Sequence, residues 1–238
     1  MTDFAEIWSY LARGPLVWLT LTLVAYVAAD ALSAAFGRAP LANPVLIAVI
    51  LLGLTLWGTG TPYAVYFEGA QFVHFLLGPA TVALAVPLYL QGARLKRAVL
   101  PVLAGLCAGS FVAVVSALWI ARALGVAPET LAALAPKSTT APVAIGIAES
   151  LGGSPTLAAV LVLITGMVGA IVATPLLNAL GVRDWRARGL ATGTAAHGIG
   201  TARALQVHPQ AGAFAGIGMG LNAILTALLA PMVLRAFL

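Results

Sequence analysis

The sequence predicts an all-α, polytopic integral membrane protein with about six to eight membrane segments, some broken or re-entrant, and an inverted repeat. The chain has 238 residues, of which 61% are hydrophobic. Only 8% are charged, whereas a soluble domain carries roughly 25%. So few charges cannot cover a globular surface, which excludes a large soluble core. We expect residues 1–238 to form one membrane domain.

Six apolar runs are candidates for membrane segments, because a helix of about 20 apolar residues crosses a bilayer. These runs are residues 14–29 (extended to 36), 43–58, 71–90, 98–121, 154–180 and 210–234. We expect the first run to be a retained helix, because acidic residues rather than a basic stretch precede it. Trp18, Trp57 and Trp119 lie near the ends of runs, where aromatic side chains meet the membrane interface.

Two basic clusters predict how the runs cross the membrane. The clusters are Arg94, Lys96 and Arg97, and Arg183, Arg186 and Arg188. The positive-inside rule places both clusters in the cytoplasm. The two runs between them, 98–121 and 154–180, already return the chain to its starting side. Residues 131–153 must therefore enter and leave from the outer side, as a re-entrant or broken segment that is buried in protein or lines a wet cavity.

A weak internal repeat relates two segments that proline interrupts. At an offset of 57 residues Pro79 aligns with Pro136, and several apolar and glycine positions after them also match. The repeat units would be residues 71–121 and 128–180, each with one broken segment and one span. One crossing per unit makes the copies inverted, a design in which broken helices meet near the midplane. We therefore predict that Pro79 and Pro136 approach each other. The alternative is a chance match in a biased composition.

The stretch "APKSTTAP" is the first candidate binding site. It contains four consecutive polar residues, Lys137, Ser138, Thr139 and Thr140. Pro142 suits the first turn of a helix, whose N-terminus offers free N–H donors and a partial positive charge. Lys137 adds a full charge, so we predict a carboxylate site, with Thr81 contributed by the opposing segment. The alternative is that Lys137 snorkels to the interface and the threonines merely cap the helix.

A second polar cluster lies in "RGLATGTAAHGIGTARAL", residues 188–205. Thr194, His197 and Thr201 are spaced so that a continuous helix would put them on one face. His197 is either a proton carrier, because its ordinary pKa is near 6.5, or a neutral packing residue. The glycines of this stretch indicate either close helix packing or a break.

Three further polar residues are assigned to this second set. Arg203 is either an anion-binding charge or an interface anchor. Asn222 carries an amide that needs partners when it is buried, and serves as structural glue more often than as a ligand. Glu149 follows the first candidate site within the same broken segment.

Several functions are not expected from this sequence. Three histidines without ligand spacing, and no HExxH or CxxC motif, argue against a metal site. The GxSxG motif is absent and no Ser/His/Asp set shares a segment, which argues against a membrane-embedded hydrolase. We expect no catalytic residues, no enzyme activity and no cofactor. No basic run with interleaved aromatics points to nucleic acid. The single cysteine excludes an intrachain disulfide.

Three motifs resemble the LrgB/CidB family of antiholin-like membrane proteins: "LLGPATVALAVPLY", "APKSTTAPVAIGIAESLGG" and "RGLATGTAAHGIGTARALQ". The resemblance covers the chain from about Asn43 to its C-terminal end, with the motifs in family order. It implies a fold related to the broken-helix, inverted-repeat transporters of the cation/proton antiporter type. It also implies a holin-like partner, LrgA or CidA, and a relation to a plastid glycolate/glycerate translocator.

The residues and the resemblance together lead to two functional hypotheses. The first is a secondary transporter of small monocarboxylates such as pyruvate, glycolate or lactate, coupled to protons and working by alternating access. The second is an antiholin-like regulator of a holin-like partner, of murein hydrolase export and of lysis, without solute transport. We expect a multi-pass protein of the bacterial inner membrane, in contact with the lipid bilayer and forming a homodimer.

Overall fold

The computed structural model describes residues 14–39, 42–76 and 98–237, and the single positions 79, 82 and 89. Regular secondary structure in these residues is helical throughout, without a strand. Contacts divide the chain into two compact units, residues 1–80 and 81–238, and each is described by itself. This architecture confirms the predicted class, an all-α membrane protein.

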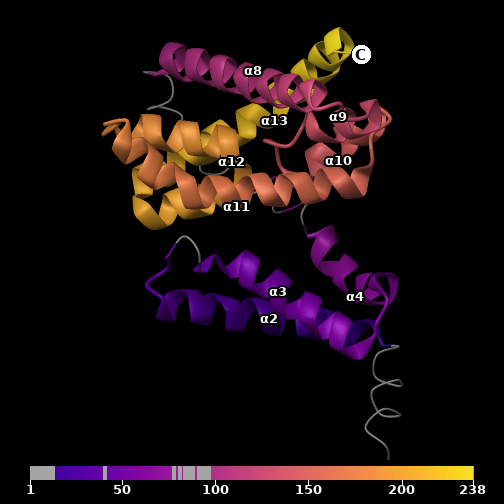
Figure 1. The fold of residues 1–238 in the computed structure, drawn as a ribbon. Helices are drawn as coiled ribbons and strands as arrows, with labels where there is room; N and C mark the ends of the chain where they lie inside the picture. The colour runs from indigo at the N-terminus through magenta and orange to yellow at the C-terminus, as the bar shows by residue number, and fades with distance from the viewer. Residues whose placement is uncertain are drawn as a thin grey trace, which may run out of the picture. The chain divides into compact units, whose positions relative to one another are not determined.

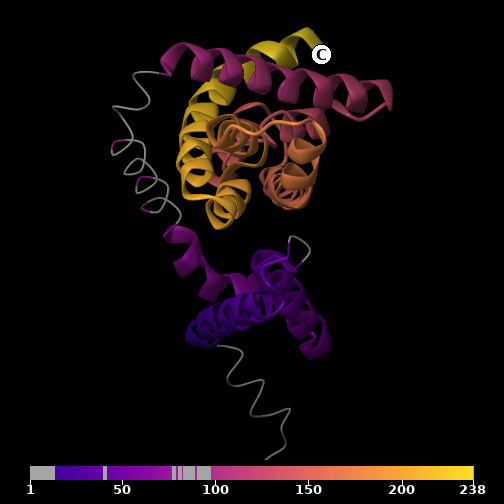
Figure 2. The ribbon, with the colours of Figure 1, turned by 90° about the vertical axis from the view of Figure 1, so that its left-hand side faces the viewer.

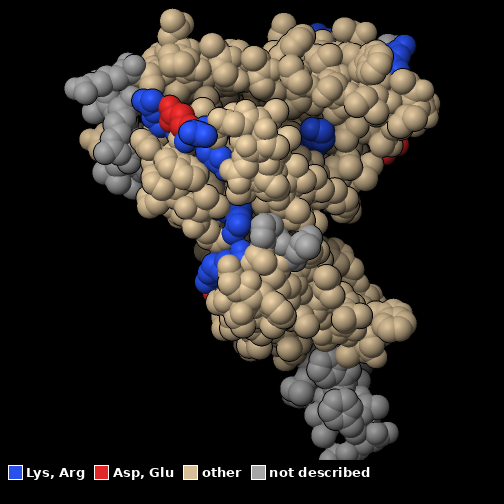
Figure 3. All heavy atoms as spheres, turned by 60° about the vertical axis from the view of Figure 1, so that its left-hand side comes forward, with Lys and Arg blue, Asp and Glu red and all other residues tan. Residues whose placement is uncertain are grey.

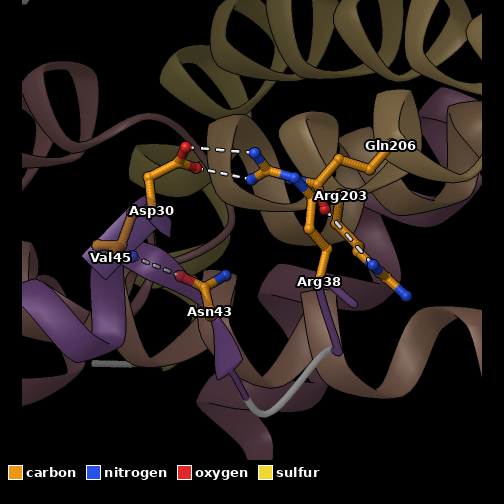
Figure 4. A network of polar contacts seen from close by, with 6 residues as sticks. All are labelled: Asp30, Arg38, Asn43, Val45, Arg203 and Gln206. Carbon is orange, nitrogen blue, oxygen red and sulfur yellow. Dashed lines mark hydrogen bonds and ion pairs between the residues drawn. The ribbon is translucent and has the colours of Figure 1, made fainter. Parts of the chain in front are cut away.

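The first unit contains α2 (Pro15–Ala35), α3 (Pro44–Thr59) and α4 (Tyr63–Phe75), and α2 packs against both of the others. Local sequence explains the ends of α3. Asn43 Oδ1 accepts a hydrogen bond from Val45 N at 2.9 Å, which caps the helix (Figure 4). Gly60 ends the helix in a left-handed conformation with φ of 64°. Helices α2 and α3 confirm the first two predicted runs.

Trp18 forms the core of the first unit. Its side chain is fully buried and meets the Tyr66 ring edge-on, with ring centroids 5.9 Å apart. Gly69 of α4 lets the two backbones approach, because a Cβ there would collide with the Pro15 carbonyl. Trp18 therefore packs inside the unit rather than facing lipid, and its predicted depth near the membrane interface stays a prediction. Trp57 and Trp119 are 84% and 65% exposed, as interfacial tryptophans would be.

An ion pair balances the acidic residue of the first span. Arg38 Nη1 lies 2.6 Å from Asp30 Oδ1, and Nη2 donates to Oδ2 at 3.2 Å (Figure 4). The chain reaches this position through Gly37 and Arg38, both with positive φ. Asp30, on the last turns of an otherwise apolar helix, is thus neutralised from the following turn.

The second unit contains the remaining helices. They are α8 (Val99–Ala123), α9 (Pro128–Leu134), α10 (Ala141–Ser150), α11 (Pro155–Ala179), α12 (Trp185–Val207) and α13 (Pro209–Phe237). Helix α8 lies along the outside of this unit (Figures 1 and 2). Helices α2, α8, α11 and α13 are long and apolar enough to cross a membrane. Lys and Arg form only isolated patches on the face in Figure 3. The chain is a multi-pass membrane protein.

Residues 131–153 form the broken segment that the sequence predicts. Helix α9 ends at Leu134, a turn follows, and α10 runs from Ala141 to Ser150. The chain then returns beside its own entry, because a Cβ on Gly153 would lie 2.7 Å from Ala133 N. Both short helices lie where α8 ends and α11 begins (Figure 1). The segment is a hairpin, which is the geometry a re-entrant segment needs.

Cysteines introduced at Glu129 and Ser154 are expected to react with an impermeant thiol reagent from the same, outer side of the membrane. These positions flank the hairpin, whose two ends are adjacent. The exposed Cys107 must first be replaced by alanine. A cysteine in place of Asp184, beyond α11, serves as the control and is expected to react from the cytoplasmic side. If the cysteines at positions 129 and 154 reacted from opposite sides of the membrane, the re-entrant topology would be contradicted.

Helices α12 and α13 are held at close distance by small residues. A Cβ on Gly189 would collide with the carbonyl of Ala211, and a Cβ on Gly193 with that of Ala215. The two glycines are four residues apart and therefore lie on one face of the helix. Small residues at such spacing allow helix backbones to touch in membranes, where dispersion rather than water exclusion holds helices together.

Gly193→Ala is expected to lower the free energy of unfolding by about 1–3 kcal/mol, because the added methyl overpacks a backbone contact. Unfolding of the purified protein by sodium dodecyl sulfate would measure the loss. Gly216→Ala on α13 is the matched control. A Cβ there meets no atom within 4 Å, so the change is expected to be neutral or slightly stabilising. Equal losses for both variants would contradict the close packing.

The internal repeat stays a prediction. Most of residues 77–97, which belong to the proposed unit 71–121, lie outside the described residues, as does the basic cluster at 94–97. Pro79 belongs to the first unit and Pro136 to the second, so their predicted approach is also untested. The predicted run 71–90 begins within α4, which starts earlier, at Tyr63.

Candidate functional site

A cavity of about 480 Å³, open to the outside of this unit along α11, lies among α8, α11, α12 and the hairpin turn. Lys137 and Ser138 of the turn face it. Most of the wall is aliphatic, with Val168 and Val172 of α11 and Ala191 and Ala195 of α12 as examples. The cavity therefore combines one cation with apolar walls, as small-molecule sites with few polar anchors do.

Lys137 lies between the two short helices of the hairpin. Its Nζ donates to Ser138 Oγ at 3.2 Å, and no carboxylate in the described part of the chain forms an ion pair with it. A half-buried ammonium without a counter-ion is costly in apolar surroundings. A bound anion would remove that cost, and Ser138 provides a hydroxyl beside it.

Thr139 and Thr140 are separated from the cavity. Thr139 is fully buried and Thr140 half-buried, and neither is among the residues that line the hollow. Both hydroxyls lack a hydrogen-bond partner among the described residues. Thr140 occupies the N-cap position of α10, with Pro142 in the first turn as predicted, but its side chain makes no cap bond. Thr81 lies outside the described residues.

Helix α12 is broken at its centre. Ala196 and His197 have non-helical backbone angles, and His197 has φ of 41° and ψ of −134°. Positive φ is strained for a residue with a side chain. The His197 ring is held by α11, since its Nε2 donates to the Val162 carbonyl at 2.9 Å and its Cε1 would lie 2.6 Å from a Cβ on Gly166. The glycine-rich stretch thus contains both a break and close packing.

The break overturns one expectation about this cluster. A continuous helix does not join Thr194 to Thr201, so the spacing that would put them on one face with His197 does not apply. Thr201 Oγ1 donates to the His197 carbonyl at 2.7 Å within the second half of the helix. Thr194 lies in the first half, and its buried hydroxyl has no partner in the described structure.

Asn222 of α13 connects the two broken segments. Its Nδ2 donates to the carbonyls of Ser138 at 2.9 Å and Thr194 at 3.1 Å. Its Oδ1 accepts from Ser110 Oγ and, at 3.2 Å, from Thr226 Oγ1. The side chain is 1% exposed, so all of its hydrogen-bonding capacity is used inside the protein. The geometry agrees with the interpretation of Asn222 as structural glue.

The remaining residues of the second set do not join one cluster. Arg203 is half-buried on the second half of α12, where its Nη1 donates to Gln206 Oε1 at 3.4 Å (Figure 4). Glu149 is exposed near the end of α10. Neither residue lines the cavity that Lys137 faces.

Two threonines of the cavity wall, Thr165 and Thr192, were not singled out from the sequence. Their only sequence signal is a hydroxyl within an apolar or glycine-rich run. Thr192 Oγ1 donates to the Arg188 carbonyl at 2.8 Å, a bond that many helical threonines make. Which face of α11 and α12 borders the cavity depends on packing, so the sequence alone could not select these two.

Comparisons with known proteins agree on one family. The model of the LrgB-like family matches residues 22–236. The uncharacterized protein YxaC of Bacillus subtilis (strain 168) is 36% identical over 93% of this chain and 96% of its own length. The holin-like protein CidB of Staphylococcus epidermidis (strain ATCC 12228 / FDA PCI 1200) is 32% identical over 92% and 95%. CidB of Staphylococcus aureus (strain Mu50 / ATCC 700699) is 32% identical over 93% and 96%. No solved structure matches.

Proposed function

The chain belongs to the LrgB-like family, and from its site we propose that it is a secondary transporter of small monocarboxylates that works by alternating access. The single observation that carries the proposal is Lys137, an ammonium without a carboxylate partner among the described residues, which faces a cavity of about 480 Å³. In the proposal the substrate carboxylate accepts hydrogen bonds from Lys137 Nζ and Ser138 Oγ. The aliphatic wall accommodates the short carbon chain of pyruvate, glycolate or lactate.

The broken helices support a transport role. Interrupted segments inside a membrane are tolerated where they border a cavity, and transporters use them to bind ions and to move one part of the protein against another. Asn222 donates hydrogen bonds to the hairpin turn and to the part of α12 just before its break. One buried side chain therefore links the two broken segments. Binding and release in this proposal require no covalent step, and the protein acts without enzyme chemistry.

Proton coupling is part of the proposal, with His197 as the candidate carrier. The ring lies in the break of α12, and Nε2 already donates to the Val162 carbonyl. In the neutral ring with its proton on Nε2, Nδ1 is the atom that takes up a second proton. A packing role for His197, held against Gly166, remains the alternative.

A second candidate function is antiholin-like regulation of a holin-like partner, of murein hydrolase export and of lysis. The observation in its favour is that two of the relatives are named holin-like protein CidB. In that role a small LrgA- or CidA-type membrane protein would be the partner. For either function we propose that the protein forms a homodimer in the bacterial inner membrane. We also propose that it acts together with this small partner protein.

Uptake of labelled pyruvate, glycolate and lactate into proteoliposomes tests the two candidates. The transporter is expected to accumulate at least one of them, more so when a proton gradient is imposed. The same vesicles are measured with and without the small partner protein. Absence of uptake in both preparations, together with a change in the partner's pore activity, would refute transport and favour regulation.

A further inference from the structure

One arginine of the second basic cluster differs from its neighbours. Arg183 and Arg186 are exposed, as expected of charges that set orientation, whereas Arg188 is only 8% exposed. Arg186 is compensated by Asp184 at 2.7 Å, and these hydrogen bonds lower the pKa of the Asp184 carboxyl. Arg188 has no carboxylate partner in the part of the chain that the structure describes.

The Arg188 guanidinium is held in place without having its charge neutralised. Nη1 donates to the Val182 carbonyl at 2.8 Å, and Nη2 makes a longer contact of 3.5 Å with the Thr174 carbonyl. Its Cζ lies 5.0 Å from the centroid of the Trp185 ring, within the range of a cation–π contact. Trp185 is itself stacked on His208, with centroids 4.6 Å apart. The other N–H groups of the guanidinium have no hydrogen-bond partner in the part of the chain that the structure describes.

The arginine also faces a hollow that adjoins the Lys137 cavity. A space of about 20 Å³, with room for about one water molecule, is lined by Trp185, Arg188 and Arg203. Thr192, Ala173 and Leu177 line both this space and the cavity of about 480 Å³. These shared residues make the two spaces neighbours, and the small one has room for about one oxygen atom beside Arg188.

We propose that Arg188 is a second carboxylate-binding position, reached from the same cavity as Lys137. The inference rests on the proposed function, and it adds a second binding position for the same class of substrate. Arginine is suited to this role, because the guanidinium N–H groups that Val182 and Thr174 do not use can donate charge-assisted hydrogen bonds to a carboxylate oxygen. The carboxylate binds at Arg188 on the side of the basic cluster and at Lys137 on the side of the hairpin.

Pyruvate-dependent thermal stabilisation of the purified full chain tests this assignment independently of transport, because a ligand that binds the folded state raises its stability. Four proteins are compared: the wild type, Arg188→Gln, Arg188→Lys and Arg183→Gln. Arg183→Gln is the matched control, because it removes one positive charge from an exposed site of the same loop. We expect at least a tenfold weaker apparent affinity for Arg188→Gln and a smaller loss for Arg188→Lys, which keeps the charge without the fork.

Two substitutions of Arg188 are used so that the test still gives a result if one variant is unstable. If Arg188→Gln is too unstable to purify, Arg188→Lys alone is compared, and at least a threefold loss is expected. Affinities for both variants within twofold of the wild type would overturn the inference, and so would the absence of pyruvate-dependent stabilisation in the wild type. Arg188-dependent binding without uptake in proteoliposomes would refute transport and leave this site standing. Uptake that does not depend on Arg188 would refute this site alone.

Discussion

Lys137→Met is expected to weaken carboxylate transport by at least tenfold while the protein still folds and inserts. The ammonium faces the cavity beside Ser138, without a carboxylate partner in the described chain. A charge-assisted hydrogen bond contributes about 1.5–3 kcal/mol. That range corresponds to roughly ten- to hundredfold in affinity. The measurement is the concentration dependence of uptake of labelled pyruvate into proteoliposomes that contain equal amounts of inserted protein.

Three comparison variants separate the role of Lys137 from a general effect of charge. Lys137→Arg is also expected to impair transport, because a planar fork does not replace a compact ammonium. Ser138→Ala, which removes the neighbouring hydroxyl, should give a smaller loss. Arg122→Met removes a positive charge from the exposed end of α8 and should transport normally. Normal rate and affinity in Lys137→Met would move the site elsewhere and return Lys137 to an interfacial anchor.

Asn222→Ala is expected to cause a loss of about 2–4 kcal/mol in the free energy of unfolding. The truncation leaves two carbonyls and two hydroxyls without the partner they share. A buried polar group without a partner costs about 1–3 kcal/mol, and hydrogen bonds between membrane helices average about 0.6 kcal/mol. Unfolding by sodium dodecyl sulfate, followed by circular dichroism, measures the difference.

Thr226→Val is the matched control for Asn222. It removes one hydrogen bond to Oδ1 and keeps the shape of the side chain, so the expected loss is below about 1 kcal/mol. The contrast tests whether Asn222 connects the hairpin turn to the break of α12, or whether its bonds are individually weak and independent. Equal losses in the two variants would exclude a connecting role.

Hydropathy predicted most of the long helices to within a few residues. The runs at 98–121, 154–180 and 210–234 became α8, α11 and α13, with bounds of Val99–Ala123, Pro155–Ala179 and Pro209–Phe237. This succeeds because insertion depends on a sum of transfer free energies over about 20 consecutive residues, which the sequence contains in full. The positive-inside rule applied to the two basic clusters then predicted that the segment between α8 and α11 returns to the side it entered. Its hairpin shape fits that topology, which stays a prediction.

The sequence identified only some of the residues that line the candidate site. Proline, lysine and hydroxyl residues in one short stretch identified the hairpin turn, and Lys137 and Ser138 face the cavity. Thr139 and Thr140 are not among its lining residues, whereas Thr165 of α11 and Thr192 of α12 are. Neighbouring residues in a turn point in different directions, so adjacency in sequence does not decide which side chains share a cavity.

Sequence alone determined the class, the family, the long spans and the position of the broken segment, because each depends on composition or on local order along the chain. Tertiary structure decided that α12 is broken at His197 and that Arg188 is buried beside Trp185. It also decided that Asn222 joins Ser138 to Thr194 across 84 and 28 positions of the chain. A partner so distant is chosen by how helices pack, and hydropathy sums carry no information about which faces meet.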